Sequence, residues 1–171
     1  MAYPLYSLEG QGYWMVQTAP VSRAAILLTR FGLALFFLLP LGVLLGYFSP
    51  QVIDLRGGLT EISVLLGIAA AIAAAGLGVG LGTAFPRFDA ANPAEIPIGT
   101  GGLLYMGLAL LHSAGLVILA ARPVYLSFTQ PGLNYLGSPE GGLWLGLLLA
   151  FTLLPAGLAL LYGYRRMGRS A

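Results

Sequence analysis

Residues 60–85 read TEISVLLGIAAAIAAAGLGVGLGTAF, an apolar run long enough to cross a lipid bilayer as a helix. About 20 helical residues span the roughly 30 Å of hydrocarbon in a bilayer. Thr60-Glu61 is typical of a helix cap, and the run stops at Phe85-Pro86. We therefore predict a transmembrane helix over residues 62–85.

Three further apolar runs have the same length, at residues 24–48, 101–121 and 141–164. Of the 171 residues, 58% are hydrophobic and only 8% are charged, whereas soluble domains carry about 25% charged residues. Ser138-Pro139 matches a Ser cap followed by Pro at the first helical position, and Pro40 predicts a kink in the first span. The sequence thus predicts an all-α, polytopic membrane protein with four transmembrane helices over residues 23–171.

Small residues recur at every fourth position of two spans and so line one face of each helix. Such faces let membrane helices approach closely. We expect packing within the chain and keep a dimer interface as the alternative. The residues are Ala70, Ala74, Gly78 and Gly82 in the second span, and Gly142, Gly146 and Ala150 in the fourth.

The eight basic residues, all arginines, are distributed unevenly between the two sides of the predicted bundle. Positive residues favour cytoplasmic segments, so we expect both termini and the 86–100 loop in the cytoplasm, at the inner membrane. The loop 122–140 then faces outward, and its tyrosines indicate either interfacial anchoring or a re-entrant hairpin. The cytoplasmic set is Arg23, Arg30, Arg87, Arg165, Arg166 and Arg169, and the outer set is Arg56 and Arg122.

The spans hold few groups that could carry chemistry. His112 is the sole histidine, and no Asp, Glu or Cys accompanies it in a span core. A proton relay or metal site needs such partners, so we expect His112 to pack with its hydrogen bonds satisfied. No Gly-rich phosphate loop with a Lys is present. We therefore predict no catalytic residue, metal site, cofactor or nucleic-acid partner, and no enzyme activity in this chain.

Two polar segments flank the spans. Residues 4–18 place apolar residues on one face, which predicts a helix lying along the membrane surface. Ala19 to Ser22 then break this helix, and Ser22 can cap the first span, in which Arg30 can snorkel to the interface. The loop 84–102 contains a capping-box pattern and a charged pair that could interact, although a solvated turn is the simpler alternative. Its residues of interest are Pro86, Arg87, Asp89, Asn92, Pro93 and Glu95.

These segments together resemble the permease subunits of ABC exporters. The resemblance rests on a Glu-Gly pair, an aromatic helix, Pro-Val-Ser and a basic residue in the next span. The loop FPRFDAANPAEI, residues 85–96, is similar to a Phe-Pro-x-Phe, Asn-Pro-x-x-Ile loop in a bacterial branch of such permeases. The matching residues are Glu9, Gly10, Tyr13, Trp14, Pro20, Val21, Ser22 and Arg30, the last standing where the family usually has Lys.

The resemblance implies that a separate cytoplasmic ATP-binding cassette ATPase hydrolyses ATP and grips a coupling helix at about residues 7–18. In the family, that helix lies between the second and third of six spans, whereas here four spans follow it. We therefore expect a second permease chain or missing N-terminal spans. Trp14 would anchor either the ATPase or the lipid interface. The scarcity of intramembrane charge favours a lipid-like, hydrophobic or bulky cargo. The alternative function is a non-transporting four-helix membrane scaffold or assembly protein.

Overall fold

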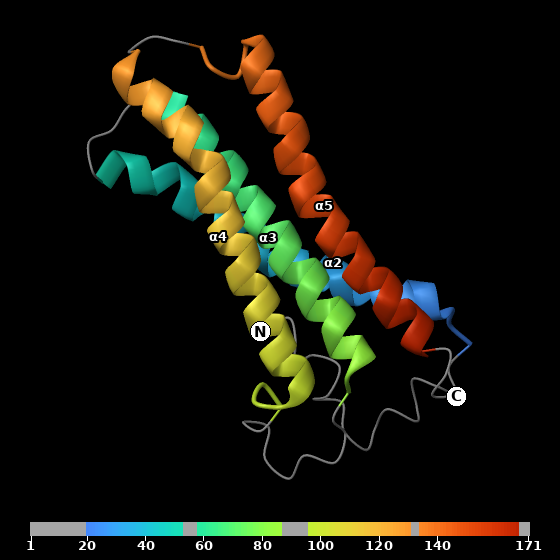
Figure 1. The fold of residues 1–171 in the computed structure, drawn as a ribbon. Helices are drawn as coiled ribbons and strands as arrows, with labels where there is room; N and C mark the ends of the chain where they lie inside the picture. The colour runs from blue at the N-terminus through green and yellow to red at the C-terminus, as the bar shows by residue number, and fades with distance from the viewer. Residues whose placement is uncertain (1–19, 53–57, 87–95, 131–133, 168–171) are drawn as a thin grey trace.

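The computed structural model describes residues 20–52, 58–86, 96–130 and 134–167. Within these ranges the chain forms four helices and no strand: α2 (Arg23–Val52), α3 (Gly58–Ala84), α4 (Thr100–Thr129) and α5 (Pro139–Met167) (Figure 1). Each helix is long and apolar enough to cross a membrane, where helices satisfy their backbone hydrogen bonds internally. The four predicted spans are confirmed, and the protein is a multi-pass membrane protein.

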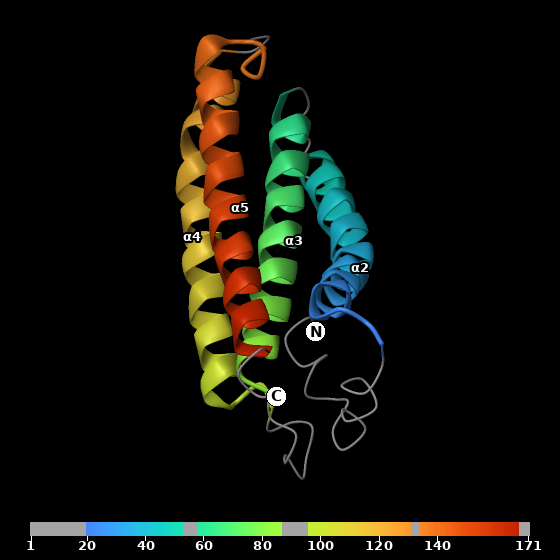
Figure 2. The same cartoon turned by 90° about the vertical axis from the view of Figure 1, so that its right-hand side faces the viewer.

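Helix α3 is the centre of the bundle. It lies between α2 on one side and the pair α4 and α5 on the other (Figure 2). Every residue of α3 from Ala75 to Ala84 is buried, whereas α2 and α4 bury few residues. Because α3 carries mostly Ala and Gly in this half, its neighbours can surround it closely.

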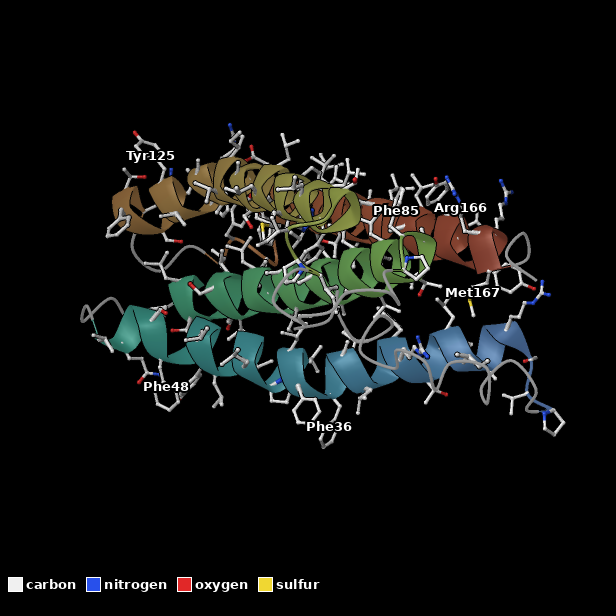
Figure 3. All side chains as sticks on the ribbon, turned by 90° about the horizontal axis from the view of Figure 1, so that it is seen from below. Phe36, Phe48, Phe85, Tyr125, Arg166 and Met167 are labelled. Atoms are coloured by element: carbon white, nitrogen blue, oxygen red, sulfur yellow. The ribbon has the colours of Figure 1, made fainter. Side chains whose placement is uncertain are left out.

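The outer face of α2 is covered with large apolar side chains. Phe36 and Phe48 are exposed and point away from the other helices (Figure 3). In water such a surface would be an aggregation hazard, but in a bilayer it is in contact with lipid. The composition of α2 therefore reflects the solvent around it and not a protein core.

Two predicted caps are confirmed. The N–H of Ala25 donates to the Ser22 hydroxyl over 3.2 Å at the start of α2. At α5, the N–H of Gly141 donates to the Ser138 hydroxyl over 3.1 Å. Each serine satisfies one of the N–H groups that a first helical turn leaves without a partner.

Two predicted boundaries are wrong. Helix α3 begins at Gly58, so Thr60 and Glu61 lie inside its first turn and do not cap it. Helix α4 continues to Thr129, so residues 122–129 are helical and do not form part of an outer loop or hairpin. Pro123 lies inside this part of α4 and is almost completely buried. Prolines interrupt helices in water but are tolerated in membrane helices when neighbours satisfy the freed backbone groups.

Candidate functional site

Most residues of the predicted coupling surface lie outside the described part of the chain. These are the coupling helix at residues 7–18 with Glu9, Gly10, Tyr13 and Trp14, and the loop residues Arg87, Asp89, Asn92, Pro93 and Glu95. The described portion begins with the elbow, where Pro20, Val21 and the capping Ser22 are all exposed. The elbow therefore leads directly into the first turn of α2.

Arg30 lies two turns inside α2, as its position in the sequence predicts. Its side chain is half-buried, and its Nη1 atom is enclosed by the surrounding protein. The predicted snorkelling thus does not carry the whole guanidinium out of the bundle. An enclosed cation in a membrane helix is costly and marks a position of functional interest.

The arginines gather at one end of the bundle. The starts of α2 and α4 and the ends of α3 and α5 meet at this end, which carries Arg23, Arg165 and Arg166 (Figures 1 and 2). Among the described residues, only Arg122 stands at the opposite end. Arg56, Arg87 and Arg169 lie outside the described ranges. We call the first end the arginine end.

A cluster of Phe85, Tyr162 and Arg166 joins α3 to α5 at the arginine end (Figure 3). The Arg166 guanidinium carbon lies 5.5 Å from the centroid of the Phe85 ring and 5.6 Å from that of Tyr162. Arg166 also donates two hydrogen bonds to the Tyr162 hydroxyl, over 3.1 and 3.3 Å. Cation–π contacts of this kind stabilise by about 0.5–1 kcal/mol at exposed sites. The chain that leaves α3 is therefore tied to the last turn of α5.

A hollow of about 500 Å³ lies beside this cluster, between the end of α3 and the start of α4. Pro86, from the predicted cytoplasmic loop, forms part of its wall together with Phe85 and Leu103. Ile98, Gly99, Thr100 and Gly101 complete its lining. Pro86 is the predicted loop residue that falls within the described ranges, and it lies at this hollow.

The predicted small-residue faces have different surroundings in the two helices. In α3, Gly78 and Gly82 are buried and Ala74 is half-buried. In α5, Gly142 and Gly146 are exposed, and a Cβ added at either would meet nothing within 4 Å. Among the described residues, the α5 face therefore contacts no other helix.

The close contacts between α3 and α5 use another set of small residues. A Cβ added to Gly76 would lie 2.5 Å from that of Ala156, and one added to Gly80 would overlap the backbone of Ala159. Gly163 in turn lies against the Gly80 carbonyl. The sequence contained this signal, because glycines at 76, 78, 80 and 82 offer two fourfold repeats on opposite faces. Periodicity alone could not decide between them.

Helices α2 and α3 also meet through glycine, at positions that sequence reasoning missed. Gly42 and Gly67 each lie against the carbonyl of the other, and a Cβ on Gly46 would lie 2.5 Å from the Ser63 carbonyl oxygen. Backbones approach this closely only where neither residue has a side chain at the contact. Helix α3 therefore makes close backbone contacts with α2 on one side and with α5 on the other.

At the end of the bundle opposite the arginine end, long side chains connect α4 to α5. Arg122 forms an ion pair with Glu140 at 2.8 Å, and both side chains are more than half exposed. The Trp144 indole N–H donates to the Leu119 carbonyl over 2.8 Å. In a regular helix this carbonyl would accept from the N–H of residue 123, which proline lacks. Trp144 thus replaces the donor that Pro123 removes.

Tyr135 completes this connection from the turn before α5. Its ring packs edge-on against that of Trp144, with centroids 6.2 Å apart. Burial raises the pKa of the Tyr135 phenol above its ordinary value of 10.0, and the nearby Glu140 carboxylate raises it further. The phenol is therefore neutral at physiological pH, which suits its buried position.

His112 is buried near the middle of α4, and its ring stacks on that of Phe151 with centroids 4.7 Å apart. The prediction of a packing residue is correct, but the prediction of satisfied hydrogen bonds is wrong. Neither ring nitrogen has a hydrogen-bond partner among the described residues. These residues also contain no group of three His, Cys, Asp or Glu that could hold a metal ion.

Comparison with known proteins adds a family relationship. The model of the family described as "Putative ATP-binding cassette" matches residues 1–170, which is nearly the whole chain. No curated protein and no solved structure matches the chain.

Proposed function

We propose, because the chain belongs to the putative ATP-binding cassette family, that it is the transmembrane permease component of an ATP-driven exporter. The observation that carries this proposal is that all four apolar helices fall within the family match. A membrane domain in such a family is the part through which cargo passes. The permease would be completed by a second chain or by further N-terminal spans.

ATP hydrolysis belongs, in this proposal, to a separate cytoplasmic ATPase, and the present chain is not an enzyme. The 171 residues contain no lysine, which a phosphate-binding Gly-rich loop requires. Four long apolar helices also provide no polar surface for a nucleotide. The chain would therefore receive mechanical work from its partner and use no cofactor of its own.

The arginine end is the proposed contact with the ATPase, and it would face the cytoplasm of the inner membrane. Its excess of arginine over the opposite end supports this orientation. The predicted coupling helix and the 86–100 loop both connect to spans at this end. Closure of the ATPase would move these segments relative to the membrane.

The cluster of Phe85, Tyr162 and Arg166 supports a route for that movement. Because Arg166 contacts both rings, a pull on Phe85 and Pro86 is transmitted to the end of α5. Helix α3 would follow α5, since their backbones touch at Gly80 and Gly163. The opening between α4 and α5 would change as a result, exposing the cargo path to one side or the other.

The test is co-purification of the full chain from native membranes, with bound ATPases identified by mass spectrometry. We expect the unaltered chain to retain an ATP-binding cassette ATPase and Trp14→Ala to retain roughly tenfold less, since aromatic anchors carry much of an interface's binding energy. Tyr125→Ala is the matched control, because Tyr125 is an exposed aromatic at the opposite end.

Equal ATPase recovery with Trp14→Ala and Tyr125→Ala would contradict the proposed contact at the N-terminal segment. Failure of the unaltered chain to retain any ATPase would favour the scaffold or assembly function. Phe85→Ala distinguishes ATPase binding from the transmission of movement to α5. We expect this variant to bind the ATPase normally, while cargo-stimulated ATP hydrolysis falls.

A further inference from the structure

A cavity of about 480 Å³ lies between α4 and α5, with α3 as its floor. Its lining is apolar apart from His112 and includes Leu77, Leu108, Leu111, Phe151 and Leu158. The volume falls within the range of about 300–1,000 Å³ that is typical of small-molecule sites. Leu111 and Leu158 are mostly exposed on the outer surface of the bundle. The cavity therefore opens toward the hydrocarbon of the bilayer, which selects molecules that dissolve in lipid.

The inner wall of this cavity carries a polar group without a partner. His112 is only 7% exposed and lines the cavity, and both of its ring nitrogens lack a hydrogen-bond partner within the described ranges. Buried polar atoms are almost always hydrogen-bonded in native proteins, and the penalty for an unmade bond is not reduced by water in a membrane. A ligand that supplies the missing bond would bind at this wall.

The chemistry of His112 indicates which ligand group would satisfy it. A hydroxyl group can accept from an imidazole N–H or donate to the other ring nitrogen, so it matches either tautomer of His112. Pro155 lines the cavity beside Phe151 and adds a further apolar surface.

We propose that this cavity binds a membrane-soluble apolar molecule with a single hydroxyl group, which is held by His112. The cavity is a concave space between three helices that opens toward the bilayer, which suits a small molecule better than the convex surface of another helix. Binding does not depend on the proposed transport function; where both hold, the bound molecule is the cargo.

The experiment uses two probes of nearly equal size, 1-hydroxypyrene and pyrene, which differ by one hydroxyl. The full chain is placed in immobilised lipid nanodiscs, and retained probe fluorescence is measured over that of empty nanodiscs. We expect saturable binding of both probes, with 1-hydroxypyrene bound roughly tenfold more tightly because of its hydrogen bonds.

Variants assign the binding to the cavity. His112→Leu should weaken 1-hydroxypyrene binding roughly tenfold and leave pyrene binding unchanged. His112→Gln retains a hydrogen-bond donor and an acceptor and should preserve most of the preference for 1-hydroxypyrene over pyrene. This variant tests the proposal if His112→Leu does not fold. Leu108→Trp fills the cavity and should weaken both probes.

Three outcomes would overturn the proposal. Probe retention equal to that of empty nanodiscs would mean partition into lipid without a site. Equal affinities for the two probes, or no effect of His112→Leu, would exclude the hydroxyl recognition. Efficient disulfide crosslinking of Leu111→Cys between two copies, together with no probe binding, would assign the cavity to a second chain. The ATPase co-purification is independent of all three, so failure of either proposal can be recognised separately.

Discussion

Helix α5 contacts α3 and α4 in opposite ways. Against α3, the glycines and alanines at Gly76, Gly80 and Ala156 bring the two backbones together. Against α4, direct contact is sparse, and Trp144 and Phe151 reach across the gap. Small residues leave no space between helices, whereas large residues bridge helices that stay apart. The cavity beside His112 exists on the second side for this reason.

The largest expected effect comes from Gly80→Leu, which places a side chain against the Ala159 backbone. Because the two backbones must separate to admit it, we expect the free energy of unfolding to fall by about 2–3 kcal/mol. The measurement is reversible unfolding of the full chain in mixed micelles. Gly157→Leu is the matched control, since nothing lies within 4 Å of a Cβ there. An equal loss in both variants would show that the backbone contact between α3 and α5 does not stabilise the bundle.

A smaller effect is expected from Trp144→Phe on the other side of α5. It keeps the aromatic ring but removes the hydrogen bond to the Leu119 carbonyl, and we expect a loss of about 1–2 kcal/mol. In a Pro123→Ala background the loss should shrink, because the alanine supplies the missing helical N–H to the same carbonyl. A double-mutant cycle of unfolding free energies checks this coupling. Strict additivity would mean that Trp144 does not compensate for Pro123.

The smallest effect is expected from Glu140→Gln, which breaks the ion pair with Arg122. Both partners are more than half exposed, and exposed pairs contribute about 0–1 kcal/mol. Any difference from the unaltered chain should disappear at about 1 M salt, where charges are screened over about 3 Å. Glu61→Gln is the control, since Glu61 also stands in a first helical turn. A salt-independent loss specific to Glu140 would indicate a role for this residue beyond the ion pair.

The sequence predicted the parts of the fold that depend on lipid and on local capping. Length and hydropathy located all four spans, and hydroxyl groups at Ser22 and Ser138 located two helix starts. The end of α4 was missed because the tolerance of Pro123 depends on Trp144, 25 residues away. The predicted residues Gly78 and Gly82 of α3 are buried, but the contacts of Gly76 and Gly80 with α5 were missed because periodicity alone does not say which neighbour each face meets.

The candidate sites show the same division between local and distant information. The bias of arginine toward one end was visible in the sequence, because it follows from the positions of the arginines relative to the four spans. The link between Phe85 and Arg166, and the cavity beside His112, each bring together residues from different helices. A single sequence carries no record of such pairs. His112 was recognised as buried, but its lack of a partner follows only from what surrounds it in space.

The bond between Trp144 and Leu119 also has a consequence for biosynthesis. When α4 first leaves the ribosome, the Leu119 carbonyl has lost its helical donor to Pro123 and has no substitute. The substitute is an indole that is translated 25 residues later. Membrane integration of α4 alone would therefore be incomplete, and α4 and α5 should enter the bilayer together as a hairpin.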